Sequence, residues 1–557
     1  MEPTARQRAL AMHEIVRLIC FESSEPYFPK KARFASLTAL SRTSKIFTEP
    51  ALDRLWWEQR SLAPLLKCMP EDAWEEHTAG TVVGRNIITT LHLRRPLKST
   101  DLSRVFYYSV RIRKLNLSRY GENKLHHELL RALDMALPIR TLMPKLASLT
   151  WDFNKKDVST MMRHILGPRV RSLHLEFDST AGLAILPFIR SACPLVSTFS
   201  LSLPTDSRTF IPVVSDLVSG LENLTHLSVP SLDQTGLTHI AHLTSLETLS
   251  LTSVDDAALP PNFFAGPCFT RLSTLRISCR TAKFCAGILQ AISSREFSSL
   301  SIYPMFPWTT LAWQHLFNVI HDHMDHKALA ALTIEDCDGL ERLAEDALPS
   351  YRISSEVLRP LLAFRELGHA TFQIYPGIDV DDDFLEEMAK AWCGLYCLQL
   401  CGEVLIAQPP RATLKCLISF ARHCRSLDTL GIRLDVTAAV PPFTQIAGKR
   451  LTHRLGYMYL GTSSLRNLWA DTEAKVAAFI SDLFPKLEGL FTLDGELPEP
   501  LKSYRESWNR VGNMVPVFSS MRSREKKLCK EEFNDDSDDE EEEESSDEDE
   551  SESEVAS

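Results

Sequence analysis

The densest set of possible metal ligands in the sequence is His321, Asp322, His323, Asp325 and His326. Zinc is bound by imidazole, thiolate and carboxylate groups, and two histidines four residues apart share one face of a helix. Here the three histidines follow one another at intervals of two and three residues. We therefore interpret this run as a solvated helix end and expect no metal site.

A second candidate is a row of cysteines at every fourth position, Cys393, Cys397 and Cys401. The run GLYCLQL between them is typical of a strand, in which these three thiols would not converge. Other cysteines also lie in apolar runs: Cys20, Cys193, Cys279 and Cys416. The 13 cysteines are widely scattered, which predicts buried free thiols in a reducing compartment.

Motifs of the common enzyme classes are absent from the sequence. It contains no G-x-x-x-x-G-K-[ST], G-x-S-x-G, H-E-x-x-H or G-x-G-x-x-G. The acidic run from Asp381 to Asp383 fits the cap and first turn of a helix that continues at Phe384. We therefore expect no catalytic residue and no cofactor, and a protein that is not an enzyme.

The charge of -11 is concentrated at one end of the chain. Residues 531–557 hold 17 of the 72 acidic residues and almost no apolar ones, which predicts a disordered segment. This tail could attract a basic partner, repel nucleic acid or only aid solubility. The basic residues elsewhere form no single stripe, so we expect no specific nucleic-acid partner. No membrane-spanning stretch is present, and we expect a cytoplasmic or nuclear protein.

From about residue 90, short segments with the pattern Leu-x-x-Leu-x-Leu recur. Apolar residues at alternate positions are typical of strands that bury one face. Fourteen such segments are present: 114–117, 146–151, 170–175, 196–203, 224–229, 246–251, 272–277, 300–302, 329–334, 371–374, 395–400, 427–434, 451–460 and 487–493. Their mean spacing of about 29 residues indicates leucine-rich repeats.

The segments between these strands often have helical patterns, as at 181–192, 314–321, 384–392, 414–422 and 474–483. A repeat of one strand and one helix cannot bury its own apolar face, so the repeats must stack. The residues between the strand leucines would face outward on the concave side. Candidate target-binding residues there are His174, Glu176, Ser250, Arg276, Ser278, Gln399 and Arg433. A generic α/β fold with buried strands is the structural alternative.

The first 75 residues are expected to form short helices. Leu10, Ile15, Leu18 and Ile19 recur near helical spacing, and a loop follows with Pro26 and Pro29. A second helix would carry Phe34, Leu37 and Leu40, and a third would carry Leu52, Leu55 and Trp56. Such a small piece has too little core to be stable alone. It either docks on a partner or covers the end of the repeats.

Residues 9–57, ALAMHEIVRLIC…ARFASLTALSRTSKIFTEPALDRLWW, resemble an F-box, in particular those of divergent fungal F-box proteins. The following segments SLAPLLKCMPEDAW and RPLKSTDLSRVFYYSVRIRKLNL resemble the stretch that joins F-box to repeats in those proteins. The residues that match the family pattern are Leu10, Ile15, Ile19, Leu37, Leu40, Ser41, Arg42, Phe47 and Trp56.

The resemblance implies docking on a Skp-type adaptor of SCF ubiquitin ligases, which are built around a cullin core. The implied contact residues are Leu10, Met12, Ile15, Ile19, Leu37, Leu40 and Phe47. Ala11 and Met12 stand where the family usually has a proline, and methionine can fill an apolar pocket.

Together these features predict an α/β protein with three parts. Residues 1–75 form a three-helix F-box-like module, 76–517 an irregular leucine-rich-repeat solenoid (horseshoe), and 518–557 a disordered basic-then-acidic tail. The first functional hypothesis is a ligase subunit whose repeats recruit an unknown target protein. The second is a repeat scaffold whose acidic tail binds basic proteins. An undetected hydrolase or transferase is the third.

Overall fold

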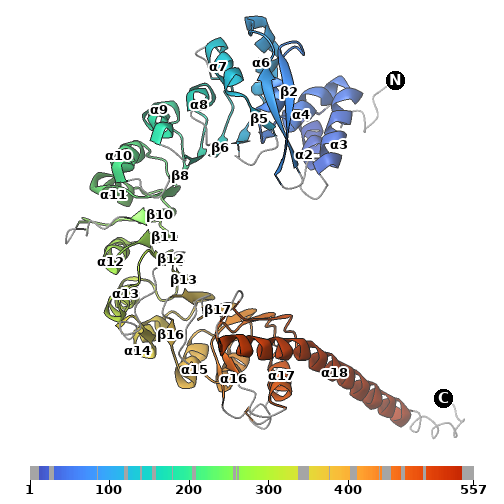
Figure 1. The fold of residues 1–557 in the computed structure, drawn as a ribbon, viewed down its shortest axis with the longest axis vertical. Coiled ribbons are helices and arrows are strands. Elements are labelled where there is room, and N and C mark those ends of the chain that lie inside the picture. The colour runs from blue at the N-terminus through green and yellow to red at the C-terminus, as the bar shows by residue number, and fades with distance from the viewer. Residues whose placement is uncertain are drawn as a thin grey trace, which may run out of the picture. The chain divides into compact units, whose positions relative to one another are not determined.

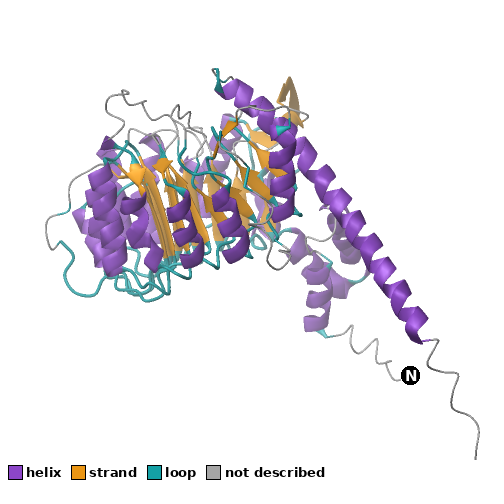
Figure 2. Ribbon diagram, turned by 90° about the horizontal axis from the view of Figure 1, so that it is seen from below, coloured by secondary structure: helices purple, strands orange, loops and turns teal. Residues whose placement is uncertain are grey.

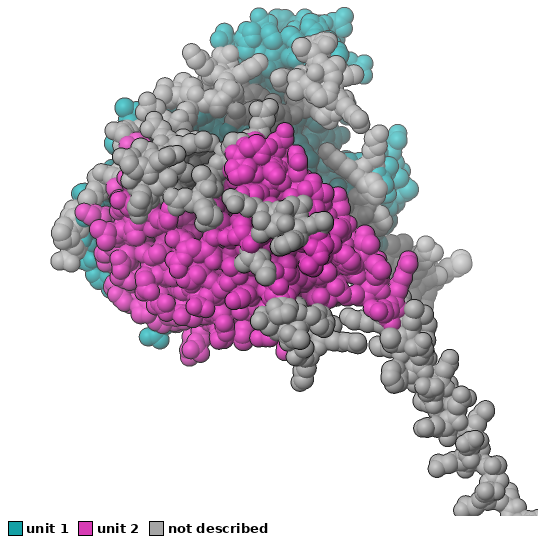
Figure 3. All heavy atoms as spheres, turned by 60° about the horizontal axis from the view of Figure 1, so that its bottom comes forward, with its two compact units in different colours: residues 1–279, 291–296 teal, residues 280–290, 297–557 magenta. Residues whose placement is uncertain are grey.

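The computed structural model describes most of the chain (Figure 1). The described residues are 12–23, 30–83, 86–117, 123–137, 141–152, 159–177, 180–203, 208–254, 259, 263–336, 350–374, 377–401, 410–437, 440–441, 453–465, 471–493, 497 and 499–541. They divide into two compact units (Figure 3). The N-terminal unit is Met1–Cys279 with Ala291–Glu296, and the C-terminal unit is Arg280–Gln290 with Phe297–Ser557.

The main sheet has 15 strands. In the N-terminal unit they are β1 (Glu58–Gln59), β4 (Lys114–Leu117), β6 (Ser148–Asp152), β7 (Ser172–Glu176), β8 (Thr198–Ser202), β9 (His226–Val229), β10 (Thr248–Val254) and β11 (Thr274–Cys279). In the C-terminal unit they are β12 (Ser299–Pro304), β13 (Ala331–Glu335), β15 (His369–Gln373), β17 (Cys397–Gln399), β18 (Thr429–Gly431), β20 (Tyr457–Tyr459) and β22 (Gly489–Phe491). The fourteen predicted segments each overlap one of these strands.

Neighbouring strands are parallel, and their apolar residues stand in register. In the N-terminal unit Leu149 pairs with Leu173, which pairs with Phe199. In the C-terminal unit Leu398 pairs with Leu430. Along β7 the buried residues alternate with partly or fully exposed ones. This alternation buries one side of the sheet, and each fully buried leucine contributes about 1.5–3 kcal/mol. It confirms the interpretation of the L-x-L pattern.

Helices lie on one face of the strands in each unit (Figures 1 and 2). In the N-terminal unit they are α7 (His127–Ala136), α8 (Ser159–Ile165), α9 (Leu186–Ala192), α10 (Ile211–Ser219) and α11 (Gln234–Ala241). The C-terminal unit has α12 (Ala282–Ala291), α13 (Thr310–His323), α14 (Ser355–Leu358), α15 (Asp382–Ala391), α16 (Lys415–His423) and α17 (Thr472–Leu483). The opposite side of the sheet is here called the strand face. A parallel sheet with helices on one side is the arrangement expected of leucine-rich repeats.

Helix α15 begins where the acidic run predicts. The Asp381 side chain accepts a hydrogen bond from the Phe384 amide at 3.1 Å and so caps the helix. Asp382 accepts bonds from the Thr413 amide and hydroxyl at 2.7 and 2.6 Å, which joins this turn to the segment before α16. The acidic run is therefore structural.

The C-terminal end of the sheet is covered by the long helix α18 (Leu501–Glu541) (Figure 1). Its Trp508 is fully buried, and the indole Nε1 donates to the Ser463 carbonyl at 3.2 Å. Arg522 pairs with Asp482 of α17 at 2.8 Å. The sequence places the start of a disordered tail at residue 518, but the helix continues past this point because Arg522 is anchored on α17. Residues 542–557 lie outside the described residues.

The described cysteines are free, and most are buried. Among them are Cys20, Cys193, Cys279 and Cys416, as their apolar surroundings predict. None of the helices within the described ranges combines the length and apolar character that crossing a bilayer requires.

A buried histidine lies just before β20. His453 Nδ1 accepts a hydrogen bond from the Leu455 amide at 3.1 Å, and Nε2 donates to the Cys424 carbonyl at 2.7 Å. The first bond fixes the tautomer, because Nδ1 accepts only without a proton. Burial lowers the pKa of His453 below its ordinary value.

We expect His453 to make the C-terminal unit less stable as pH falls through about 6.5. Above this value both states are neutral at this residue. Below it the unfolded chain takes up a proton before the folded chain does, so stability falls by at most about 1.4 kcal/mol per pH unit. Denaturant unfolding at pH 7.5 and 5.5 should show a smaller pH dependence in His453→Gln than in the wild type. Equal dependence in both proteins would contradict this assignment.

Candidate protein-interaction surfaces

Three helices precede the first strand of the sheet and form a small bundle, here called the helical module. They are α2 (His13–Glu22), α3 (Lys30–Thr43) and α4 (Lys45–Leu55). The core of the module is Cys20, Leu37 and Ala51. Leu40, Phe47 and Leu55 pack against this core and are only partly buried. A core of so few residues contributes little stability, so the module depends on contacts with its surroundings to stay folded.

Apolar side chains remain exposed on all three helices of the module. The exposed fraction is 59% for Leu18, 43% for Phe34 and 48% for Ile46. Phe21 is also exposed, but the Arg54 guanidinium lies 4.6 Å from its ring centroid. Apolar residues on the outside of a small bundle are typical of a docking surface.

The residues implied as adaptor contacts fall into three groups. Met12 is exposed, and Ile15 and Ile19 are half-buried. Leu37 is buried in the core, with Leu40 and Phe47 packed around it. Leu10 lies outside the described residues. Leu37 therefore belongs to the core of the module, while Leu40 and Phe47 keep part of their surface exposed, and the adaptor contact stays a prediction for these residues.

Leu18, Phe34 and Ile46 were missed as surface residues. Leu18 was grouped with Ile19 because both fit an approximate helical spacing. Consecutive residues differ by about 100° around a helix, so Leu18 lies nearly opposite the buried Val16. An apolar residue opposite a buried one was the available signal.

The helical module is joined to the sheet by backbone and side-chain contacts. The Trp57 carbonyl accepts bonds from the Arg113 and Lys114 amides, both at 2.9 Å, where β1 pairs with β4. Arg111 is only 8% exposed and forms ion pairs with Glu49, at 2.6 Å, and with Asp53. Hydrogen bonds from Arg111 and Tyr107 lower the pKa of Glu49. The module is therefore tied to the segment that leads into β4, while apolar side chains elsewhere on it stay exposed.

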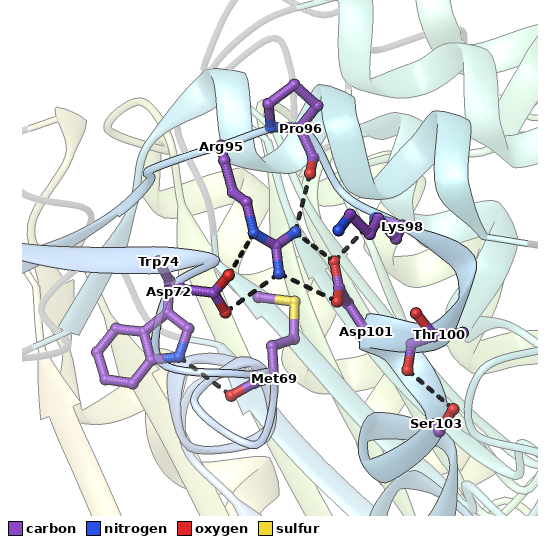
Figure 4. Close-up of polar contacts among 9 residues, drawn as sticks. All are labelled: Met69, Asp72, Trp74, Arg95, Pro96, Lys98, Thr100, Asp101 and Ser103. Atoms are coloured by element: carbon purple, nitrogen blue, oxygen red, sulfur yellow. Dashed lines mark hydrogen bonds and ion pairs between the residues drawn. The ribbon is translucent and has the colours of Figure 1, made fainter.

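The segment after the helical module contains a cluster of charged groups (Figure 4). It lies between a hairpin, β2 (Trp74–Val83) and β3 (Asn86–Leu93), and the helices η1 (Ser99–Leu102) and α6 (Ser103–Ser109). Strand β3 also pairs with β5 (Asn123–Leu125). Arg95 donates to Asp72 at 2.7 and 3.1 Å and to Asp101 at 2.7 and 3.2 Å. These bonds lower the pKa of both carboxyl groups. The Asp101 side chain also accepts from the Lys98 amide at 2.8 Å, so the cluster holds the chain entering η1.

The predicted target-binding residues are placed differently from one another on the strand face. His174 and Arg276 are exposed, and Glu176 and Ser250 are half-buried. Ser278, however, is buried. The prediction for Ser278 is corrected, because the residues at the end of β11 are covered on both sides.

Two further predicted positions are occupied by internal contacts. Gln399 accepts from Gln373 Nε2 at 2.6 Å. Arg433 Nε donates to Thr462 at 2.8 Å, and burial lowers the pKa of Arg433 to about 10. Arg433 lies beyond the end of β18 and is half-buried, so part of its side chain is engaged in this internal contact.

Sequence reasoning also missed three exposed aromatic residues on the strand face. Tyr457 and Tyr459 flank the buried Met458 in β20, and Phe491 lies on the neighbouring β22. The Tyr-Met-Tyr alternation within a strand segment was a signal that could have identified two of them.

The histidines tested for metal binding make contacts with neighbouring protein groups. His321 contacts Asp322 at 2.9 Å, and the His326 ring bonds to the His321 carbonyl at 2.8 Å. Across the described parts of the chain, no group of three or more His, Cys, Asp or Glu side chains is arranged to hold a metal ion.

Comparisons with known proteins place the chain in no family. No protein-family model and no curated protein matches the sequence. The Rad7–Elc1 complex from yeast includes a chain with 14% identity and a TM-score of 0.34, over 67% of this chain and 85% of that one. The leucine-rich-repeat protein LegL7 from Legionella pneumophila has 10% identity and a TM-score of 0.26, over 70% and 94%. Likenesses this weak carry no argument about function.

Proposed function

We propose that this protein is a non-enzymatic adaptor that recruits a target protein to an SCF-type ubiquitin ligase. The helical module docks on a Skp-type adaptor and so on the cullin core, and the strand face of the repeats binds the target. No residue of the chain acts chemically on the target.

The observation that carries this proposal is the two-sided construction of the helical module. One side is fixed by Arg111 to the segment before β4, while exposed apolar side chains such as Leu18 and Ile46 remain on the module. A module that only capped the repeats would not need apolar residues on its free surface. The F-box resemblance of residues 9–57 supports the same reading.

Binding of purified Skp-type adaptor to the full-length protein tests the proposal. Leu18→Asp and Ile46→Asp should each weaken adaptor binding at least about tenfold, because each places a charge in a desolvated apolar contact. Leu311→Asp is the matched control, since Leu311 is 76% exposed on α13 and the charge change is the same. Unchanged thermal melting of all three variants would show that they are folded.

A folded protein that fails to bind the adaptor would contradict the ligase proposal. The alternative would then be a repeat scaffold whose acidic C-terminal segment binds basic proteins. An equal loss of adaptor binding in the Leu311→Asp control would indicate a nonspecific effect of the added charge.

A further inference from the structure

Three aromatic side chains gather at the end of the strand face in the C-terminal unit. Tyr457, Tyr459 and Phe491 are here called the aromatic platform. The Phe491 ring centroid lies 6.3 Å from that of Tyr457 and 5.1 Å from that of Tyr459, with ring planes inclined by 30° and 23°. Their exposed fractions are 38%, 38% and 43%. Clustered exposed aromatic rings are typical of binding surfaces.

A glycine makes this arrangement possible. In the register of β20 and β22, Tyr457 stands opposite Gly489 and Tyr459 opposite Phe491. A Cβ atom at Gly489 would lie 2.5 Å from the Phe491 ring. Because Gly489 has no side chain, the Phe491 ring leans back over it and comes within reach of both tyrosines.

Two carboxylates border the aromatic platform. Asp428, Gly456 and Glu488 each immediately precede a strand, and their backbones are joined by bonds of 2.9 and 2.8 Å. Asp428 and Glu488 are exposed, and Gly456 places no side chain between them. The Tyr457 hydroxyl donates to Glu488 at 3.1 Å. This bond, with a smaller contribution from Asp428, raises the pKa of Tyr457.

We propose that the aromatic platform, with Asp428 and Glu488, binds an arginine or lysine side chain of an extended segment in the target protein. The faces of aromatic rings attract cations, and a bordering carboxylate adds direct charge attraction. This inference names the target chemistry within the proposed function, and rests on that function only in taking the strand face as the target-binding surface.

Cationic residues also lie near the aromatic platform in sequence. Arg454 and Lys486 are exposed and precede Gly456 and Glu488 by two residues, in the turns that lead into the strands. Because both side chains are cationic, they favour the competing possibility that the target segment is acidic. Peptides of opposite charge separate the two possibilities.

The test uses the full-length protein and fluorescein-labelled peptides of alternating arginine and serine, or of alternating glutamate and serine, at physiological ionic strength. The arginine peptide should bind more tightly. Phe491→Ala should weaken it about threefold to tenfold, and so should the Asp428→Asn, Glu488→Gln double variant. Gly489→Val should act like Phe491→Ala, because it displaces the ring without removing an aromatic residue.

Matched controls lie outside the aromatic platform, on α9 and α10 of the N-terminal unit. Phe188→Ala removes a ring of similar exposure, and Asp216→Asn neutralises an exposed carboxylate; neither should change peptide binding. If Phe491→Ala bound the arginine peptide as tightly as the wild type, the peptide would be held elsewhere, as on the acidic tail, and the inference would fall. Tighter binding of the glutamate peptide would also overturn it. Ile46→Asp should bind the arginine peptide as the wild type does. Loss of adaptor docking can therefore be told apart from loss of peptide binding at the aromatic platform.

Discussion

Trp508→Ala should lower the free energy of unfolding of the C-terminal unit by about 3–5 kcal/mol. The indole is fully buried, and its Nε1 hydrogen bond to the Ser463 carbonyl would be lost together with the ring. Val511 and Val515 of the same helix are buried beside it in sequence, so α18 would lose a large part of its hold on the end of the sheet.

Denaturant unfolding measures this loss, and amide hydrogen exchange locates it. Exchange should increase at Leu490 and Phe491, because α18 contacts β22 directly. Met521→Ala is the matched control, since Met521 is 60% exposed on the same helix and its replacement should change stability by less than about 0.5 kcal/mol. Equal effects of the two substitutions would show that Trp508 is not the anchor.

Leu37→Ala should destabilise the helical module by about 2–5 kcal/mol. Leu37 is buried between Cys20 and Ala51, and this core contains few other fully buried side chains. The sequence-based assignment of Leu37 to the adaptor contact leads to a different expectation, namely weaker binding by a protein of unchanged stability.

Limited proteolysis within residues 12–55 separates these expectations without any partner present. The module should be cleaved faster in Leu37→Ala, whereas Leu18→Ala should leave the rate unchanged because Leu18 is exposed. If Leu37→Ala resisted proteolysis like the wild type and bound the adaptor poorly, Leu37 would be a contact residue after all.

The repeats could be predicted from sequence because their pattern reflects one local rule. Apolar residues at alternate positions of a strand face the helices, as Leu173 and Leu175 do in β7. The strand β1 was missed because Glu58 and Gln59 have no apolar alternation. Its place in the sheet comes from the Trp57 carbonyl bonds to Arg113 and Lys114, residues more than fifty positions away.

Surface residues were harder to predict, because burial on the strand face depends on neighbours distant in sequence. Arg433 fits the outward pattern, but it is half-buried and its Nε donates to Thr462, 29 positions away. Phe491 is recognised as part of an aromatic cluster only from its neighbours in the structure, Gly489 and Tyr459. In the helical module, Leu18 and Leu37 are chemically alike, and only the packing of three helices decides which is exposed.

The two ends of the sheet carry dedicated covers, and this limits how the gene for such a protein can lengthen. At one end Arg111 fixes the helical module beside β1, and at the other Trp508 fixes α18 over the last strand. A repeat duplicated outside either cover would leave its apolar face in water. New repeats can be accommodated only by insertion between existing interior ones. There each side of the inserted repeat meets a leucine-bearing strand like its own.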